Sequence, residues 1–208
     1  MARYIQGSCR ICRRAGEKLF LKGSRCYTPK CAEEKRHVPP GMHAKSRRRL
    51  SDWGAQLKEK QKARYIYGVL ERQFRRYFAE AAKRPGVTGE YLLQLLERRL
   101  DNVVYRLGFA DSRNQARQLV NHGHITVNGR RTKISSFEVK ISDTIAWRSG
   151  STKTVYYKKL AEAPPSQIPP VWLSLDKENL VGKVTSLPSR GDIQVPFMES
   201  AIVEYYSR

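Results

Sequence analysis

The sequence predicts an α+β protein, in which a mainly helical domain follows an N-terminal four-cysteine arm and accompanies a small α/β module. Three observations support this class. All four cysteines lie within the first 31 residues. From residue 51 onward, apolar residues recur at helical spacing. Around residue 128, a short alternating strand runs into an Asn-Gly turn, which is a strong hairpin signal.

The cysteine spacing predicts a structural metal site. Cys9 and Cys12 are separated by two residues, Cys26 and Cys31 by four, and a loop of 13 residues joins the two pairs. Two short-spaced pairs of this kind are typical of four thiolates around one zinc ion, with no position left for a catalytic water. An iron–sulfur cluster takes the same ligands and stays open as the alternative. Disulfides are disfavoured because no secretory signal is visible.

A basic arm follows over residues 35–50. Pro39, Pro40 and Gly41 interrupt any helix, and the segment has almost nothing to bury. Such an arm is expected to lie against phosphates, with a localisation signal as the competing interpretation.

Two amphipathic helices are predicted next. The first carries one apolar stripe and ends at Pro85-Gly86; the stripe consists of Leu70, Phe74, Tyr77, Phe78 and Ala81. The second begins near Thr88 and is expected to run unbroken to a C-cap at Gly108. Its stripe consists of Leu92, Leu96, Leu100, Val103, Val104 and Leu107.

The small module begins with a helix. Ser112 is its predicted N-cap, with Gln115 completing a capping box, and the helix ends at residues 121–123. Strands are expected at 124–127, 130–134 and 144–147, with the hairpin turn at Asn128-Gly129. The later stretch 201–206 alternates in character and carries acidic charge.

The charge of the chain points to a polyanionic partner. Forty Lys and Arg against 19 Asp and Glu give a net charge of +21, which repels itself unless an anion neutralises it. Residues 1–50 carry +11, 51–97 carry +3, 98–160 carry +9 and 161–208 carry −2. This clustering favours two nucleic-acid surfaces, and leaves the tail for protein contacts. No apolar run is long enough to span a bilayer, so a cytoplasmic protein without a membrane partner is expected.

The run from Ser112 to Gly129 carries a family resemblance. Its Ser-Arg-x-Gln-Ala-Arg start and His-Gly-His-Ile-x-Val-Asn-Gly end resemble an RNA-binding module shared by pseudouridine synthases, tyrosyl-tRNA synthetases and the fourth protein of the small ribosomal subunit. Residues 65–74, 96–109, 172–176 and 204–208 are similar to that ribosomal family, from Arg3 to Arg208. The cysteine set resembles its metal-binding bacterial branch.

The resemblance implies a structural, non-enzymatic constituent of the small (30S) subunit. Such proteins bind 16S rRNA at a multi-helix junction of the 5′ domain and nucleate assembly. They contact small-subunit proteins three and five, influence decoding accuracy and line the path by which mRNA enters the ribosome. Some bacterial members repress translation of their own operon. No small-molecule substrate is implied.

The resemblance also implies how the chain is divided. Residues 1–45 would form the metal-binding and basic arm. Residues 46–97, completed by 171–208, would form the helical domain, with the RNA-binding module 98–170 inserted between them.

The residues expected to contact RNA are the cations, polar groups and one aromatic residue of the basic blocks: Arg3, Arg10, Arg13, Arg14, Lys35, Arg36, His37, His43, Lys45, Arg47, Arg48, Arg49, Lys58, Lys62, Arg64, Tyr65, Arg72, Gln73, Arg76, Arg99, Ser112, Arg113, Gln115, Arg117, Gln118, His122, His124, Asn128, Arg130 and Arg131. Two other functions compete with this one. An RNA-modifying enzyme would need a nucleophile, a carboxylate pair or a phosphate loop, and none emerges from the sequence. A zinc-finger DNA regulator would need a standard finger spacing or a dimerisation heptad.

Overall fold

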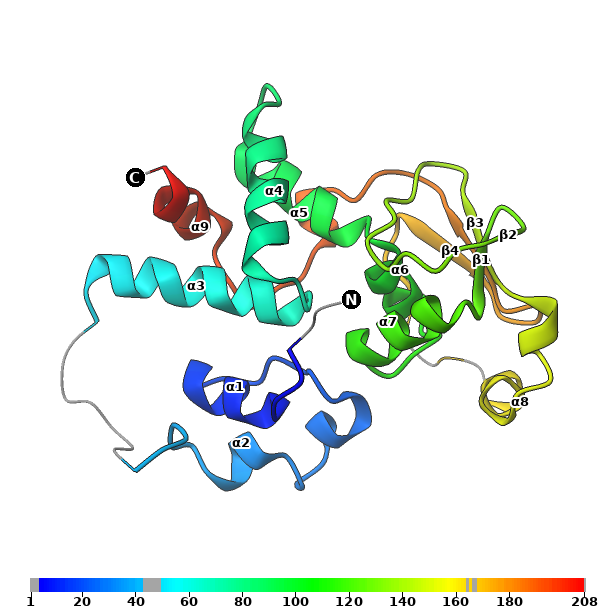
Figure 1. Cartoon of the computed structure of the whole chain (residues 1–208), viewed down its shortest axis with the longest axis horizontal. Helices are drawn as coiled ribbons and strands as arrows, with labels where there is room; N and C mark the ends of the chain where they lie inside the picture. The colour runs from blue at the N-terminus through cyan, green and yellow to red at the C-terminus, as the bar shows by residue number, and fades with distance from the viewer. Residues whose placement is uncertain (1–3, 43–49, 164, 166–167, 208) are drawn as a thin grey trace. The chain divides into compact units, whose positions relative to one another are not determined.

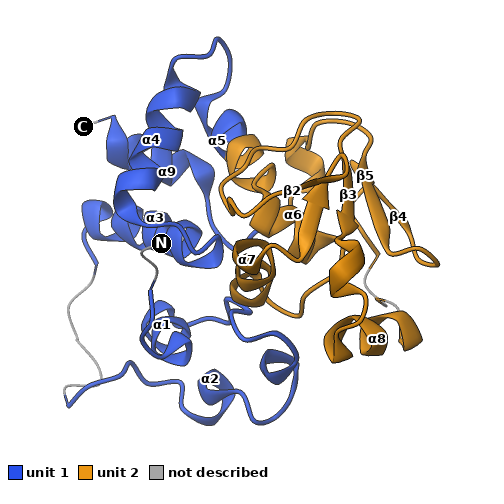
Figure 2. Ribbon diagram, turned by 45° about the vertical axis from the view of Figure 1, so that its right-hand side comes forward, with its two compact units in different colours: residues 1–92, 195–208 blue, residues 93–194 orange. Residues whose placement is uncertain are grey.

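The structure is a computed structural model that describes residues 4–42, 50–163, 165 and 168–207. The chain divides into two compact units (Figures 1 and 2). Unit 1 comprises residues 1–92 and 195–208, and unit 2 comprises residues 93–194. Over the described residues, the helices are all too short or too polar to cross a membrane.

Over the described residues of unit 1, all regular elements are helices, joined by loops. Its elements are α1 (Ser8–Ala15), the 3-10 turn η1 (Gly23–Tyr27), α2 (Ala32–Lys35), α3 (Asp52–Ile66), α4 (Glu71–Ala82), the start of α5 (Thr88–Glu97) and α9 (Glu199–Tyr206). Ser51 caps α3, because its hydroxyl oxygen accepts the N–H of Gly54 at 3.3 Å.

The core of unit 1 forms where α4 and α9 pack together and α9 lies along α3. The stripe predicted on α4 is confirmed at Phe74, Tyr77 and Ala81, which are buried, but Leu70 precedes the helix as its N-cap and is exposed. The Tyr206 ring packs on Phe74 and Phe78, with centroids 6.2 and 4.6 Å away. Residues 201–206 therefore lie in a helix that packs onto the helical unit.

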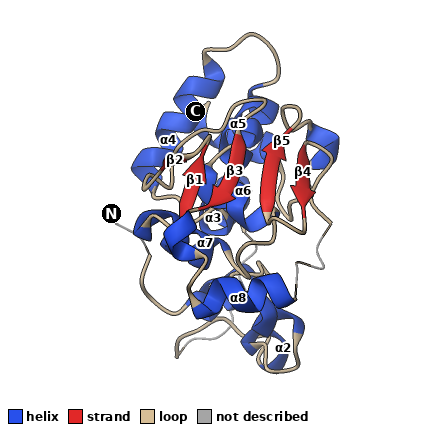
Figure 3. Ribbon diagram, turned by 90° about the vertical axis from the view of Figure 1, so that its right-hand side faces the viewer, coloured by secondary structure: helices blue, strands red, loops and turns tan. Residues whose placement is uncertain are grey.

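Unit 2 combines helices with one antiparallel sheet (Figure 3). Besides the end of α5, its elements are α6 (Leu100–Arg106), α7 (Arg113–His122), β1 (Ile125–Val127), β2 (Arg130–Arg131), β3 (Thr144–Trp147), η2 (Ser149–Ser151), α8 (Val155–Glu162), β4 (Leu173–Asp176), β5 (Val181–Val184) and η3 (Arg190–Asp192). The strand order is β2-β1-β3-β5-β4. The predicted α+β class is confirmed in this mixture of helices and a small sheet.

The hairpin at Asn128-Gly129 is confirmed, with positive φ angles of 50° and 77° at its two turn residues. The return strand is shorter than predicted and ends at Arg131 instead of residue 134. After it, the backbone turns toward α6, where the carbonyls of Ser135 and Phe137 accept the N–H groups of Asp101 and Leu100. Thr132 still donates its N–H to the carbonyl of Ile125 on β1 at 3.3 Å, and the chain from Ser135 to Phe137 is engaged with α6 instead.

The prediction of one unbroken helix from 88 to 107 is wrong. α5 ends at Glu97 and α6 begins at Leu100, because Arg99 is extended (φ −65°, ψ 135°) and forms a β-bridge with Glu138. The N–H of Val139 also bonds to the carbonyl of Arg98 at 3.0 Å. The N–H groups of Leu100 and Asp101 thus bond to the carbonyls of Phe137 and Ser135 instead of the carbonyls four residues earlier. Gly108 ends α6 as predicted, with φ at +76°.

The boundary after the module also differs from the predicted one. β5 pairs with β3, through Thr144 opposite Lys183 and Ile145 opposite Gly182, and β4 pairs with β5. Residues 171–194 therefore belong to unit 2, and only 195–208 belong to unit 1. Trp172, Leu173, Leu180 and Val184 join the buried core of unit 2 from this segment.

Candidate nucleic-acid interface

A buried ionic cluster holds α6 and α7 together in unit 2. Arg99 donates to Asp101 from Nε at 3.0 Å and from Nη2 at 2.7 Å, and its side chain is fully buried. Arg117 approaches the same carboxylate at 3.6 Å and is also buried. Both arginines were predicted to contact RNA. Their burial argues against direct contact and assigns them to positioning the helices.

A second polar network fixes the start of α7. The buried Glu97 carboxylate accepts from Arg106 at 2.7 and 3.1 Å and from Asn102 at 2.7 Å. Asn102 in turn accepts from Nε of Arg113 at 2.8 Å. The Arg113 guanidinium also lies over the Tyr105 ring, 4.5 Å from its centroid. Arg113 is therefore held at the N-terminus of α7, half-buried.

The N-terminus of α7 is capped only partly as predicted. The Ser112 hydroxyl oxygen accepts the N–H of Gln115 at 3.3 Å, as an N-cap should. The amide oxygen of Gln115, however, accepts from Asp111 instead of Ser112, at 2.9 Å. Gln118 is exposed one turn further on. Free N–H groups and positive potential at a helix N-terminus favour an anion there.

The C-terminus of α7 carries a cluster of cations. Arg131 donates to the carbonyls of Gly123 and His122, at 3.3 and 3.1 Å. The guanidinium packs so closely that a Cβ added to Gly123 would lie 2.3 Å from its Nε. The φ of +73° at Gly123 favours glycine, and a side chain there would also displace the Arg131 guanidinium from these carbonyls. Arg148 lies beside this cluster, because its backbone N–H bonds to the carbonyl of His124 at 2.8 Å. Its side chain is exposed.

His124 reports the positive potential of this cluster. Its Nδ1 lies 2.9 Å from the Ser151 hydroxyl. Burial lowers the pKa of His124 below its ordinary 6.5, and the neighbouring His122, Arg131 and Arg148 lower it further. The cations that lower this pKa also give the cluster a positive potential, which favours a phosphate nearby.

We expect the titration of His124 to respond to RNA. In the free protein its midpoint should lie below 6.5, and binding of an RNA fragment should raise it because a phosphate stabilises the imidazolium. NMR of the imidazole protons measures both values. Potassium chloride at matched ionic strength is the control, since screening alone also raises the midpoint. An RNA effect no larger than that of salt would place the backbone away from this cluster.

The remaining predicted residues of unit 2 are exposed on the hairpin. Asn128 has a structural role, because its side chain donates to Asp143 at 2.8 Å and accepts from the N–H of Thr144 at 2.8 Å. Arg130 points from the exposed strand β2. Six exposed cations of the block 98–160 were not predicted from the sequence: Lys133, Lys140, Arg148, Lys153, Lys158 and Lys159. The one feature of the sequence that indicated them is their position in the basic block 98–160, which carries a net charge of +9.

Several predicted cations of unit 1 are engaged in ion pairs. Lys62 lies 2.6 Å from both Glu17 and Glu59, and Arg64 lies 3.6 Å from Glu71. Arg13 donates to the carbonyl of Val38 at 2.9 Å and so fixes the start of the basic arm. His37 lies 3.1 Å from the buried Glu33 carboxylate.

The other predicted residues of unit 1 divide by exposure. The exposed ones are Arg10, Arg14, Lys35, Arg36, Arg72 and Arg76, and the half-buried ones are Lys58, Tyr65 and Gln73. Six predicted residues lie outside the described residues: Arg3, His43, Lys45, Arg47, Arg48 and Arg49.

The four cysteines come from three elements of unit 1. Cys9 and Cys12 lie on α1, Cys26 in η1 and Cys31 at the N-cap of α2. None is in a disulfide, and all but Cys9 are buried. Burial raises the pKa of Cys12, and the charges of the other three thiols raise it further.

The chemistry of this cysteine set fits zinc, since zinc binds four thiolates and Cys9, Cys26 and Cys31 all lie near enough to Cys12 to affect its pKa. The N–H of Lys22 also donates to Sγ of Cys26 at 3.4 Å, as outer hydrogen bonds to metal-bound sulfur do. As placed, however, no three His, Cys, Asp or Glu side chains within 4–42, 50–163, 165 and 168–207 are arranged to hold a metal ion. The four thiols are thus suitable ligands for zinc, but in this structure they are not arranged around one ion.

Comparison with known proteins agrees with this organisation. Residues 3–97 match the family described as Ribosomal protein S4/S9 N-terminal domain, and residues 98–145 match the S4 domain. The chain is 56% identical to the small ribosomal subunit protein uS4 of Pelotomaculum thermopropionicum. It is 54% identical to that of Ruminiclostridium cellulolyticum and 55% to that of Halothermothrix orenii. Each match covers the whole of both chains. The module with cations at both ends of its helix α7 is thus the S4 domain, and the chain belongs to the uS4 family.

Proposed function

We propose that this chain is a structural, non-enzymatic constituent of the small ribosomal subunit, located in the cytoplasm, which binds ribosomal RNA. The observation that carries the proposal is the set of cations at the two ends of α7. The guanidinium groups of Arg113 and Arg131 are held in place by the buried Asn102 amide and by the carbonyls of His122 and Gly123, and Arg148 lies exposed beside them. Fixed guanidinium groups lose little freedom on binding phosphate, which favours recognition of folded RNA by shape.

Membership in the uS4 family supports a finer assignment. The RNA partner is 16S rRNA at a multi-helix junction of its 5′ domain, where binding nucleates subunit assembly. The neighbours are small-subunit proteins three and five and the mRNA on its way into the ribosome, contacts through which the chain influences decoding accuracy. Repression of its own operon uses the same RNA surfaces. The two basic blocks, residues 1–50 with a net charge of +11 and residues 98–160 with +9, carry enough cations to contact several RNA helices at such a junction.

Salt dependence of binding tests the phosphate contacts. Removing Arg130 and Arg148 together by alanine substitution should reduce the slope of log affinity for 16S rRNA against log salt by about 1.4–1.8, the range for two lost phosphate contacts in single strands and duplexes. Lys83→Ala with Lys177→Ala removes the same charge from exposed positions outside the proposed surface. An equal change of slope in both double variants would contradict the proposal.

We also propose that Cys9, Cys12, Cys26 and Cys31 hold one structural zinc ion, with an iron–sulfur cluster as the alternative. The metal would join α1, η1 and α2, a segment with few buried apolar side chains of its own. It would add no catalytic chemistry, because four protein ligands fill a tetrahedral site.

Removing two of these ligands should unfold the cysteine arm locally and leave unit 2 folded. Cys9→Ser with Cys12→Ser is expected to release the metal and to speed hydrogen exchange over residues 4–42, while exchange over 93–194 stays unchanged. Metal analysis identifies the ion, and an absorbing, iron-containing protein would exclude zinc. Wild-type protein without bound metal, or exchange unchanged by the substitutions, would contradict the site.

A further inference from the structure

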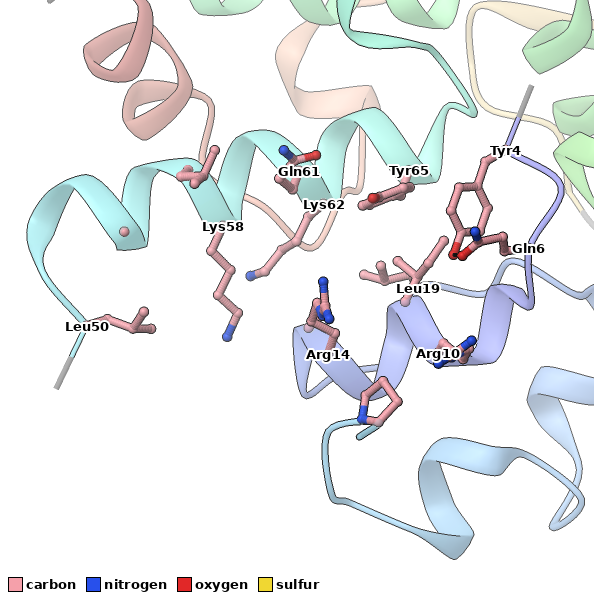
Figure 4. Close-up of a pocket in the computed structure, with 15 residues that line it drawn as sticks. Tyr4, Gln6, Arg10, Arg14, Leu19, Leu50, Lys58, Gln61, Lys62 and Tyr65 are labelled. Carbon is pink, nitrogen blue, oxygen red and sulfur yellow. Dashed lines mark hydrogen bonds between the residues drawn. The ribbon is translucent and has the colours of Figure 1, made fainter. Parts of the chain in front are cut away.

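A pocket in unit 1 is not explained by the surfaces described above. It lies between α1 and α3, encloses about 570 Å³ and has Leu19, Ile11 and Leu57 in its apolar lining. Tyr4, Gln6 and Tyr65 lie together at one end (Figure 4). This volume suits one small ligand or one extended group of a larger one.

The lining of this pocket is positively charged. It includes Arg10, Arg14, Lys58 and Lys62, and no Asp or Glu. Lys58 and Lys62 extend from α3 toward α1, while Arg14 extends from α1 toward α3 (Figure 4). Like charges aimed at one space repel each other, and the repulsion is relieved when an anion enters.

Only one of the four cations already has its counter-charge. Lys62 is fixed by Glu17 and Glu59, at 2.6 Å from each. The side chains of Arg10, Arg14 and Lys58 form neither a hydrogen bond nor an ion pair with any residue in the described ranges. Three cations therefore remain available to an anion that enters between the two helices.

The aromatic end favours a flat ring as the rest of the ligand. The Tyr4 and Tyr65 rings meet edge to face, with centroids 5.6 Å apart. Arg64 lies over the Tyr65 ring at 4.7 Å and holds it in place. The amides of Gln6 and Gln61 also line the pocket, and each both donates and accepts hydrogen bonds. Phosphate-binding cations beside an aromatic and amide wall are the elements that recognise an unpaired nucleotide.

We propose that this pocket binds one unstacked nucleotide of an RNA strand, with the phosphate between Arg14 and Lys58 and the base against Tyr65. The inference rests on the proposed RNA-binding function and adds a subsite to it. A base-paired helix does not fit a pocket of this size, so the bound nucleotide must lie outside a duplex. A free nucleoside monophosphate has the same chemistry and is the alternative source of the ligand.

Binding measurements with the full chain distinguish the outcomes. Arg14→Ala with Lys58→Ala should weaken binding to 16S rRNA at least tenfold and reduce the salt slope by about 1.4, the single-strand value for two phosphates. The double variant should keep the wild-type melting temperature, because neither side chain has a hydrogen-bond or ion-pair partner among the described residues. The pair Lys83→Ala and Lys177→Ala is the control of equal charge. If the pocket variant matches this control while wild type binds, the pocket proposal fails alone. If wild type does not bind, the proposed function fails.

The aromatic wall has its own test. Tyr65→Ala should weaken RNA binding by about 5- to 150-fold, the range for one stacked base, whereas Tyr65→Phe should restore it. A photoreactive phenylalanine at position 65 should crosslink to one or two adjacent unpaired nucleotides of 16S rRNA. Crosslinks confined to paired nucleotides would overturn the proposal. Titration with free adenosine monophosphate should give no saturation in the micromolar range, and tight saturation would assign the pocket to a free nucleotide instead.

Discussion

Replacing Asp101 with alanine is expected to lower the free energy of unfolding of unit 2 by about 3–5 kcal/mol. Asp101 is the shared counter-ion of Arg99 and Arg117, and all three side chains are buried. Without the carboxylate, two guanidinium groups stay in a low-dielectric interior with no negative charge between them. Urea unfolding followed by segment-resolved hydrogen exchange over residues 93–194 measures the loss.

Two further variants distinguish the effect of an unpaired buried charge from a general sensitivity of unit 2 to the loss of any carboxylate. Glu178→Ala removes an exposed carboxylate and should change stability by less than about 0.5 kcal/mol. Replacing Asp101 with leucine and both arginines with methionine should recover most of the stability, because apolar groups of similar volume need no counter-ion. A loss below 1 kcal/mol for Asp101→Ala, on the scale of an exposed ion pair, would show that the cluster is not buried in solution.

Phe74→Ala is expected to destabilise unit 1 by about 3–5 kcal/mol, the usual cost of deleting a buried aromatic ring. Phe74 is fully buried on α4, and its ring stacks 6.2 Å from that of Tyr206 on α9. The cavity would lie between segments more than 120 residues apart in sequence, so the loss should also free α9. Hydrogen exchange over residues 199–207 detects this.

The exposed aromatic of the cysteine arm gives the matched comparison. Phe20 is 36% exposed and stacks on Tyr27 at 5.0 Å. Phe20→Ala should therefore cost less than about 1 kcal/mol and leave α9 protected. Equal losses for the two substitutions would contradict the packing of α4 against α9.

Local signals predicted the elements that local interactions determine. Ser112 and Asn128-Gly129 act through neighbours within a few residues, and the helix start and the hairpin turn predicted there are correct. The break at Arg99 was missed because it depends on a bridge to Glu138, 39 residues away. β4 and β5 were missed for the same reason, since their place in the sheet depends on pairing with β3.

Charge counting located the binding surfaces but not the individual contacts. It identified the blocks that contain Arg130, Arg131 and Arg148, and it also included Arg99 and Arg117, which are buried. Whether an arginine meets solvent or a carboxylate depends on the helix face that packs inward. Asp101 faces both arginines across a helix junction that the sequence pattern presented as continuous.

We propose that this chain recognises one site in the small-subunit RNA through the cations of unit 2, among them the exposed Arg130 and Arg148. Chemical protection of 16S rRNA by the full-length protein, mapped at each nucleotide, tests it most directly. We predict one cluster of protected nucleotides at a multi-helix junction of the 5′ domain, weakened by Arg130→Ala with Arg148→Ala and unaffected by Lys83→Ala with Lys177→Ala. Protection scattered over all domains, or a footprint that both double variants weaken equally, would contradict the claim.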